Sequence, residues 1–465
     1  MNVRLFVAWL PLSALGFTLH GSAQPADTAV QHRYERIVSQ IVASGLASGK
    51  AYSILRELTG TVGARLSGSP AAGRAVEWAE QTMEHLDFQN VHTEAVIVPH
   101  WVRGSVEEAS IIGSSNKTVP LTMCALGGSI ATPDDGITAE VVEVKSFDEL
   151  RGMGEGAKGK IVFFNRPFDR SKYNTFEAYG GAVNQRGQGA SEAARAGGVA
   201  ALVRSMTSRI DDVPHTGAMN YNDSLPKVPA AALSTVAANL LDSMLQANHS
   251  LRVRLRLACR MLPDTESANV IGELKGSEHP EEVIVVGGHL DSWDKGRGAH
   301  DDGAGVSHSM EALRLLKELG LTPRRTIRAV LFMNEENGLR GGKAYAERGR
   351  PGEKPVAAIE TDAGGFTPRG FGVTADSLTI DKVARWAYLF KPIDADRISK
   401  GGGGADIGEL GRKGVPTIGL RVDGQRYFDY HHSDSDTIDK VNERELELGA
   451  ISLAILCYVL AQEGL

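Results

Sequence analysis

Near the start of the chain, hydrophobic residues recur at helical spacing. The segments 33–60 and 71–86 carry apolar side chains three and four positions apart, which predicts two amphipathic helices. A β-branched run over residues 91–103 follows them and predicts a strand. From about 110 to 265, short apolar runs alternate with glycine-rich turns. This second pattern predicts a self-contained, β-rich insert.

Strands and helices alternate after the insert. Apolar runs at 268–276, 281–289 and 325–336 predict buried strands, while the segments 306–320 and 443–462 predict helices. Such alternation is typical of parallel sheets whose two faces are covered by helices. We therefore expect an α/β fold with a mixed, mostly parallel sheet flanked by helices.

Length and composition leave room for both parts. The 465 residues are 42% hydrophobic and 23% charged, an ordinary globular composition that suffices for two domains. We expect a core domain formed by residues 24–109 and 266–465, with residues 110–265 inserted into it. The net charge of -7 comes without any basic tract, so nucleic acid is not an expected partner.

The N-terminus has the pattern of an export signal. One positive charge at Arg4 precedes an apolar run from Leu5 to about Leu19, and small residues follow up to Ala23. A membrane anchor is the alternative, but Pro11 and Gly16 interrupt the run. We predict a signal peptide over residues 1–23, no membrane span after its cleavage, and a secreted or periplasmic protein.

Polar residues gather where the predicted strands end. In the stretch GGHLDSWDKGRGAHDDGAGV, residues 287–306, acidic and imidazole side chains follow an apolar strand almost without hydrophobic residues between them. Other polar groups follow the next strands along the chain. Because the carboxyl ends of parallel strands open into one crevice, these side chains are expected to meet there. The candidates are His289, Asp291, Asp301, Glu335, Glu336, Asp362, His431 and His432.

Carboxylates at the exit of a buried strand need a cation. Glu335 and Glu336 directly follow such a strand, a costly place for unpaired charge. Zinc takes imidazole and carboxylate ligands, and a pair of zinc ions needs one carboxylate that bridges them. Asp301, between glycines, is a natural bridge. Glu335, beside the ligand candidate Glu336, can serve as the general base.

The ordered set of these residues resembles the M28 metallopeptidases, a family of co-catalytic zinc peptidases. The resemblance implies two Zn ions. The motifs TVGARLSGSP (61–70), VPHWVRG (98–104), IETDAGGF (359–366) and HHSDSDT (431–437) resemble a carboxypeptidase branch of that family. The resemblance to this family also implies that the insert is a protease-associated domain and that the Asp301–Asp302 peptide bond is cis. The implied roles are one zinc on His289, Asp301 and Asp362, the other on Asp301, Glu336 and His432, with Asp291 orienting His289 and Glu335 as the base.

Two assignments stay open within this set. His431 is an alternative to His432 as a ligand, although the matched HHS motif favours His432. His300, beside the proposed bridge, is expected to support the site or lie at the surface. Many family members have a late Ser-Asp-His element, whereas this chain has Ala405-Asp406-Ile407, so no role of that histidine carries over.

The expected function is an exported exopeptidase. The resemblance implies hydrolysis of short peptides, chiefly dipeptides with a free C-terminus, through attack of a metal-bridging hydroxide, and a possible homodimer. The alternatives are an aminopeptidase, a binding protein that has lost its metals, and an acyltransferase of the glutaminyl cyclase type. A peptide carboxylate needs cationic or N–H donors, for which Arg65, Arg103, Arg421 and the glycines at 401–404 are candidates.

Overall fold

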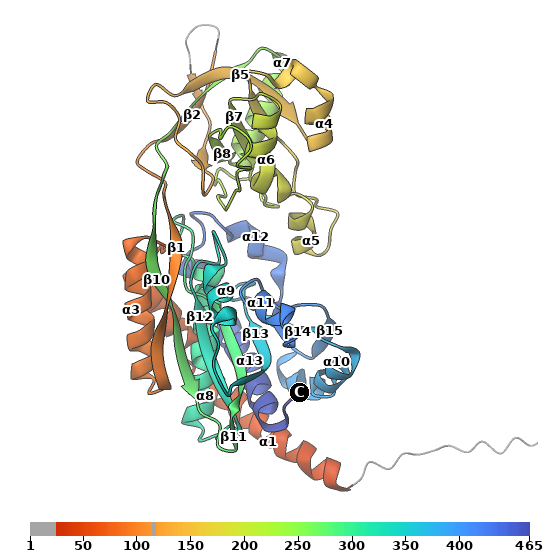
Figure 1. The fold of residues 1–465 in the computed structure, drawn as a ribbon. Coiled ribbons are helices and arrows are strands. Elements are labelled where there is room, and N and C mark those ends of the chain that lie inside the picture. The colour runs from red at the N-terminus through yellow and green to blue at the C-terminus, as the bar shows by residue number, and fades with distance from the viewer. Residues whose placement is uncertain (1–24, 114–117) are drawn as a thin grey trace, which may run out of the picture.

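The computed structural model describes residues 25–113 and 118–465, so the expected signal peptide at 1–23 lies outside the described residues. The chain forms two eight-stranded sheets, each with its own helices (Figure 1). The N-terminal and C-terminal parts of the chain together build the larger sheet, and the middle of the chain builds the smaller one.

The larger sheet is parallel at its centre and antiparallel towards its edges. Strands β12, β11, β13 and β16 run parallel to one another. Strands β1 and β10 pair antiparallel at one side of this group, and β14 pairs antiparallel with β16 at the other side but parallel with the edge strand β15. This arrangement confirms the expected mixed α/β fold. In spatial order the strands are β1 (Gln89–Val102), β10 (Arg260–Leu274), β12 (Arg325–Phe332), β11 (His279–His289), β13 (Lys354–Glu360), β16 (Thr417–Val422), β14 (Pro368–Thr374) and β15 (Arg397–Lys400).

Both faces of this sheet are buried, which explains the unbroken apolar run of β11. Successive side chains of a strand point to opposite faces. Ile284 and Val286 belong to one hydrophobic cluster, and Val283 and Val285 belong to another. The first face packs against α1 (Pro25–Ser48), α2 (Ala51–Glu57), α3 (Pro70–His85), α8 (Ala304–Glu318) and α13 (Glu443–Glu463), and the second against α9 (Arg340–Glu347) and α11 (Gly408–Arg412). A further helix, α10 (Ser377–Ala384), lies near β15.

The helix expected over 33–60 is divided in two. Helix α1 ends at Ser48, α2 begins at Ala51, and a π-helical turn follows over Leu58–Val62. At the break, Gly49 packs so closely on the side chain of Glu447 that a Cβ atom there would collide with it. The break is therefore set by packing against α13, which helical periodicity alone does not reveal.

Helix α13 lies at the centre of the core. Among the described residues it alone combines the length and apolarity that a membrane span requires, and 89% of its most apolar 18-residue window is buried inside the protein. It packs against α8 and α1. The apolarity of this helix thus reflects burial within the protein.

The smaller sheet also carries helices. Its spatial order is β3 (Thr118–Pro120), β2 (Glu107–Ile112), β9 (Arg252–Leu257), β5 (Ile137–Val144), β6 (Ile161–Phe164), β7 (Ala200–Arg204), β8 (Ala230–Leu233) and β4 (Met123–Ala125). The helices of this unit are α4 (Phe147–Gly152), α5 (Thr175–Gly180), α6 (Asn184–Arg195) and α7 (Thr235–Ala247). Residues 260–265, expected in the insert, instead lengthen β10, because they continue its antiparallel pairing with β1.

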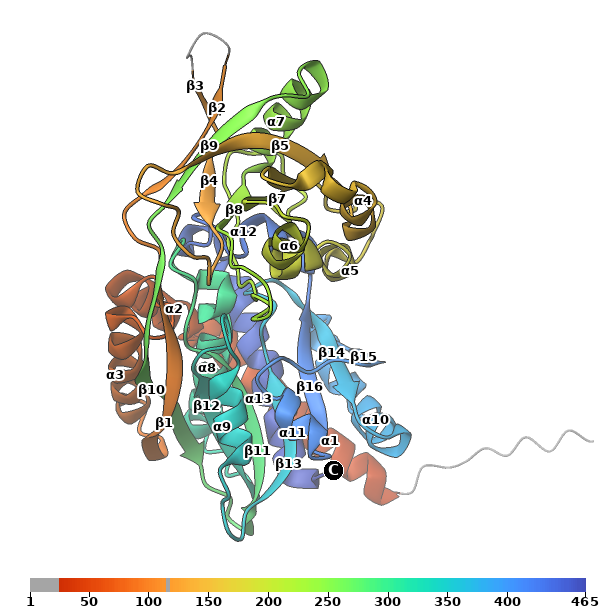
Figure 2. The same ribbon diagram turned by 45° about the horizontal axis from the view of Figure 1, so that its top comes forward.

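Two chain crossings join the units, one after β1 and one before β10. They meet at Gly104, whose φ of 81° lies in the left-handed region, and a Cβ there would collide with the backbone of Ala258. The smaller unit lies over the carboxyl end of the larger sheet. There α5 contacts α12 (Tyr427–Tyr430), a short helix that follows β16 (Figure 2).

Candidate metal centre and substrate cavity

The polar residues singled out from the sequence meet at the carboxyl ends of neighbouring parallel strands. His289 is the last residue of β11, Glu335 and Glu336 follow β12, and Asp362 follows β13. His432 lies just after α12 and has a left-handed backbone, with φ of 59°. The crevice expected at this edge of the sheet therefore holds these side chains together.

Asp301 is the centre of the cluster. Its Oδ1 lies 3.2 Å from Nε2 of His289, and its Oδ2 lies 3.3 Å from Nε2 of His432. The same His432 nitrogen is 3.1 Å from Oε2 of Glu336. On the other side, Nε2 of His289 is 3.8 Å from Oδ1 of Asp362. Asp301 thus stands between two groups of ligand atoms, and its peptide bond to Asp302 is cis, as expected.

These residues fit a divalent metal. Donor atoms of His289, Asp301 and Glu336 lie within 4.8 Å of one another, as do those of Asp301, His431 and His432. Oδ2 of Asp301 is buried and accepts no hydrogen bond from the described residues, despite its ion-pair distance to His432. Buried imidazole and carboxylate groups with an unsatisfied oxygen form the donor set that zinc prefers.

Charges within the cluster compensate one another. Burial lowers the pKa of His289, but contacts with Asp301 and Asp362 raise this pKa well above its usual value. Conversely, burial raises the pKa of Asp301, and contacts with His289 and His432 bring this pKa well below its usual value. Burial and the charge of Asp301 raise the pKa of Glu336 to about 7. A metal ion bound by these residues would take the place of a proton on the ligating imidazole nitrogen.

Of the two adjacent histidines, His432 is the better placed ligand. It lies at contact distance from both Asp301 and Glu336, whereas Nε2 of His431 is 3.8 Å from Oδ2 of Asp301. The two rings stack, with 3.5 Å between their centroids. Burial and the charge of His432 lower the pKa of His431 well below its usual value.

Two residues next to the cluster, Asp302 and His300, form their hydrogen bonds with backbone groups. Asp302 accepts the backbone N–H of His289 at 3.1 Å with one oxygen and that of Gly305 at 2.9 Å with the other. His300 is fully buried, with Nδ1 3.2 Å from the backbone nitrogen of Gly365 and Nε2 3.3 Å from the carbonyl of Lys440. Both residues therefore support the local backbone.

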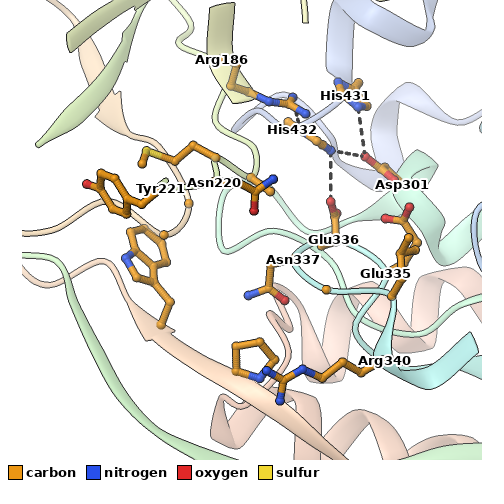
Figure 3. A pocket seen from close by; sticks show the side chains of 18 of the residues that line it. Arg186, Asn220, Tyr221, Asp301, Glu335, Glu336, Asn337, Arg340, His431 and His432 are labelled. Carbon is orange, nitrogen blue, oxygen red and sulfur yellow. Dashed lines mark hydrogen bonds and ion pairs between the residues drawn. The ribbon is translucent and has the colours of Figure 1, made fainter. Parts of the chain in front are cut away.

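Glu335 faces the cluster without joining its close contacts. Figure 3 shows its carboxylate directed into the same space as those of Asp301 and Glu336. Its side chain is partly exposed and lines the cavity. Burial, together with the charges of Asp362 and Glu336, raises the pKa of Glu335 well above its usual value. This position suits a group that exchanges a proton with a molecule in the cavity.

A cavity of about 790 Å³ lies between the two units. The larger unit contributes Tyr427, Phe428 and most of the metal-ligand candidates, whereas His289 is buried behind the cavity wall. The smaller unit contributes Tyr179, Asn220 and Arg186, the last of which approaches His432 (Figure 3). Further bonds tie the units together at this point. The backbone N–H of Thr216 donates to the carbonyl of His432 at 2.9 Å, and Nδ1 of His215 lies 2.7 Å from the carbonyl of His431.

Of the arginines suggested by the sequence for carboxylate binding, two are engaged in bonds within the protein and the third lines a second cavity. Arg65 is completely buried and donates to backbone carbonyls, including that of Leu290 at 2.5 Å. Arg103 forms ion pairs with Asp294 and Glu107. Arg421 donates to the carbonyl of Gly401 and lines a second cavity of about 660 Å³, beside Asp362.

Sequence reasoning missed two residues near the site. Arg186 comes from α6, about a hundred positions before His289, and its surroundings in the sequence carry no motif. Asp406 is buried with neither carboxylate oxygen hydrogen-bonded within the described parts of the chain. Burial and the charges of Glu360 and Glu335 raise the pKa of Asp406 well above its usual value. In the sequence, Asp406 is a single acidic residue close to a run of glycines, and no pattern there predicts that it is buried.

Comparison with known proteins shows similarity along almost the whole chain. The family model described as peptidase family M28 matches residues 269–455. Carboxypeptidase Q from Bos taurus is 37% identical over 462 residues, which cover 97% of this chain and 95% of that protein. A solved peptidase M28 precursor from Shewanella amazonensis matches with a TM-score of 0.89 at 35% identity, covering 93% of this chain and 97% of that one. A zinc aminopeptidase from Bacillus subtilis shares the fold, with a TM-score of 0.65 at 20% identity over 89% of this chain and 95% of its own.

Proposed function

The chain belongs to peptidase family M28, and from this membership we propose that it is an exported di-zinc exopeptidase acting on dipeptides with a free C-terminus. Its relatives include carboxypeptidase Q and zinc aminopeptidases, so the chain is a zinc metallo-exopeptidase. The preference for dipeptides, the number of metal ions and the role of each residue are the finer parts of the proposal.

The observation that carries the proposal is the position of Asp301 between two groups of ligand atoms. His289, Asp301 and Asp362 would hold one zinc ion, and Asp301, Glu336 and His432 would hold the other. When bound, zinc supplies an acidified water and a Lewis acid for the scissile carbonyl. A binding relative without metals would have no need for this buried set of charges.

Glu335 is the proposed general base. Its carboxylate faces the cluster and makes no close contact with the imidazoles, so it can take a proton from the attacking water. The same carboxyl group then passes the proton to the nitrogen of the leaving amine. Asp291, the other proposed catalytic residue, acts by holding both His289 and the turn that contains Glu335.

The smaller unit limits the substrate. It lies over the carboxyl end of the larger sheet, and the cavity of about 790 Å³ between them is of the size that holds small ligands. Such a roof favours short peptides over the interior of a long chain. We propose that this unit is the protease-associated domain expected from the sequence. Export through residues 1–23 and a homodimer belong to the same proposal.

A matched set of dipeptides tests the proposal. The set consists of one dipeptide with free ends, its N-acetyl derivative and its C-terminal amide, each incubated with zinc-loaded and with chelator-treated protein. We expect cleavage of the free and acetylated dipeptides, loss of cleavage on amidation, and no activity after chelation. Loss on acetylation with retention of the amide would instead make the protein an aminopeptidase, the function that the Bacillus subtilis fold relative carries in its name.

A further inference from the structure

The second cavity, of about 660 Å³, adjoins the main cavity of about 790 Å³. Phe176 and Asp362 line both of them, so the two spaces meet beside the metal-ligand cluster. The proposed base Glu335 lines the main cavity and is not part of the wall of the second. Since Glu335 passes a proton to the leaving amine of the C-terminal residue, that residue lies in the main cavity. The N-terminal residue of a dipeptide is therefore directed towards the second cavity.

Both units enclose the second cavity. The smaller unit contributes the segment 173–176, and the larger unit contributes residues of β14, β15 and β16. Two hydrogen bonds fix the segment over the larger unit. Oγ1 of Thr175 donates to the carbonyl of Gly424 at 2.8 Å, and Nε2 of Gln425 donates to the carbonyl of Tyr173 at 2.9 Å. The cavity is thus a bounded space beside the cluster, of a size that holds a side chain.

Two arginines stand on the same face of the sheet at this cavity. In β14, Phe371 and Val373 face the hydrophobic core, so Gly370 lies on the opposite face. Gly370 pairs with Arg397 of β15 on one side and with Arg421 of β16 on the other. Paired residues of adjacent strands point to the same face, and their two strand spacings separate the arginine Cα atoms by about 10 Å. Because both side chains line the cavity and the residue between them has no side chain, both guanidinium groups can reach one ligand.

Neither arginine is neutralised by the protein. Arg397 and Arg421 form no ion pair within residues 25–113 and 118–465, whereas the third arginine of the cavity, Arg369, pairs with Asp394 at 3.0 Å and with Asp423 at 3.5 Å. The remaining carboxylates of the cavity wall are engaged as well. Oε2 of Glu360 accepts the backbone N–H of Ile407 at 2.9 Å, and Asp362 is a metal-ligand candidate.

Arg421 is held in a fixed position by the backbone around it. Its Nη2 donates to the carbonyl of Gly401 at 2.7 Å. It also passes so close to Gly372 that a Cβ there would lie 2.7 Å from Nε. A guanidinium carries five N–H donors, so most of them stay available to a ligand. A guanidinium restrained in this way loses little freedom when it binds a carboxylate through two parallel hydrogen bonds.

We propose that the second cavity binds an acidic side chain of the N-terminal residue of the substrate, with Arg421 and Arg397 as its anion-binding groups. The inference rests on the proposed function and adds a substrate class to it. Glu360 of β13 pairs with Gly419 of β16, and Asp362 and Arg421 each follow two residues later. Arg421 is therefore on the strand next to the metal-ligand candidate, whereas Arg397 is two strands farther away. Arg421 makes the main contact, and dipeptides that begin with glutamate or aspartate are the preferred substrates.

The test compares three dipeptides that differ at the N-terminal side chain: glutamyl-leucine, its uncharged isostere glutaminyl-leucine, and leucyl-leucine. Each is assayed with the zinc-loaded parent, with Arg421→Gln, with Arg397→Gln and with the control Arg385→Gln. Arg385 is an exposed arginine at the end of α10 that is not part of the cavity wall. The measured quantities are kcat/KM for each dipeptide, zinc content, and calorimetric binding of the products glutamate and glutamine.

We expect the parent to prefer glutamyl-leucine over glutaminyl-leucine at least about 10-fold in kcat/KM, as for one charge-assisted hydrogen bond. Arg421→Gln should lose most of this preference because glutamyl-leucine is cleaved more slowly, while glutaminyl-leucine, leucyl-leucine and the zinc content stay at the parent level. Arg397→Gln should lose a smaller part, and Arg385→Gln should match the parent. Binding of glutamate, but not of glutamine, should weaken in the same order.

Two results would overturn the inference while the proposed function stands. One is a parent enzyme that cleaves glutamyl-leucine and glutaminyl-leucine equally well. The other is an Arg421→Gln variant that slows all three dipeptides by the same factor, since the residue would then act on the fold of the site and not on the acidic side chain. Failure of the zinc-loaded parent to cleave any of the three free dipeptides would overturn the proposed function, and the inference with it.

Discussion

The backbone carbonyl of Asp291 lies 3.0 Å from Nδ1 of His289 and accepts its hydrogen bond, whereas the Asp291 carboxylate turns elsewhere. Its Oδ1 accepts the backbone N–H groups of Asn334 at 2.7 Å and Glu335 at 3.1 Å. One residue therefore orients the imidazole with its main chain and fixes the turn of the proposed base with its side chain. Nε2 of His289 is left to face Asp301.

This dual role predicts unequal effects of two substitutions at Asp291. Alanine leaves two buried N–H groups without an acceptor, each at a cost of about 1–3 kcal/mol. We expect Asp291→Ala to lose about 2–6 kcal/mol of unfolding free energy. Asparagine keeps an oxygen in the same place, so Asp291→Asn should lose much less. Denaturant unfolding of both variants measures the difference, and equal stabilities would remove the assigned role of the carboxylate.

Substitution of Glu335 should separate catalysis from metal binding. Glu335→Gln keeps the shape of the side chain but cannot accept a proton, so kcat should fall about 10²–10⁴-fold while the zinc content stays at the parent level. Asp301→Ala is the matched opposite, because it removes the carboxylate shared by both groups of ligand atoms and should lose zinc. The measurements are kcat and zinc content of the two purified variants. Near-parent turnover in Glu335→Gln would exclude it as the base.

A buried carboxyl group far from the site should make the unfolding free energy of the protein depend on pH. Glu447, in α13, accepts the backbone N–H of Tyr52 at 3.3 Å, and its other oxygen has no partner within the described chain. Burial and the charge of Glu311 raise the pKa of Glu447 from 4.5 to about 7. The folded protein thus binds a proton that the unfolded chain releases, and this group's contribution to stability is lost as pH rises from 4.5 to about 7.

Glu447→Gln removes that proton linkage. We expect the difference in unfolding free energy between pH 5 and pH 8 to shrink by about 2–3 kcal/mol in this variant. Glu443→Gln, at an exposed position of the same helix, serves as the control and should keep the pH profile of the parent. Urea unfolding at both pH values provides the measurement. An unchanged profile in Glu447→Gln would mean that its pKa is not raised.

Two glycines should respond in opposite directions to alanine. Gly104 has a left-handed backbone and no room for a Cβ beside Ala258, so Gly104→Ala should cost more than about 1–2 kcal/mol. Gly73 lies within α3, where a Cβ would have no neighbour within 4 Å, so Gly73→Ala should gain about 0.5–1 kcal/mol. Thermal unfolding of both variants tests the pair. Similar shifts of Tm would show that the crossing at Gly104 is not strained.

The sequence was sufficient for the core and for the convergence of the strand-end residues. The apolar run before His289 marks a strand buried on both faces, and the same holds for the run before Glu335. Strands of this kind pair in parallel, and their carboxyl ends meet at one edge, so the polar residues that follow them must approach one another. The close contacts of His289 and His432 with Asp301 agree with that reasoning.

The remaining features depend on contacts between distant segments. The hydrogen bond from His289 to the carbonyl of Asp291 arises from backbone geometry, which residue types do not encode. Arg186 reaches His432 only because the smaller unit folds over the larger sheet. The division of the first helix at Gly49 likewise follows from its packing against Glu447. In each case the periodicity of hydrophobic residues identifies the helix or strand but carries no information on its tertiary contacts.

The meeting of the two crossings at Gly104 and Ala258 has a topological consequence. Strands β1 and β10 pair antiparallel up to Val102 and Arg260, so the smaller unit lies between the two arms of a β-hairpin. A short turn would close this hairpin without changing the strand order of the larger sheet. Residues of the smaller unit can therefore vary while the strands that carry the metal-ligand candidates keep their register.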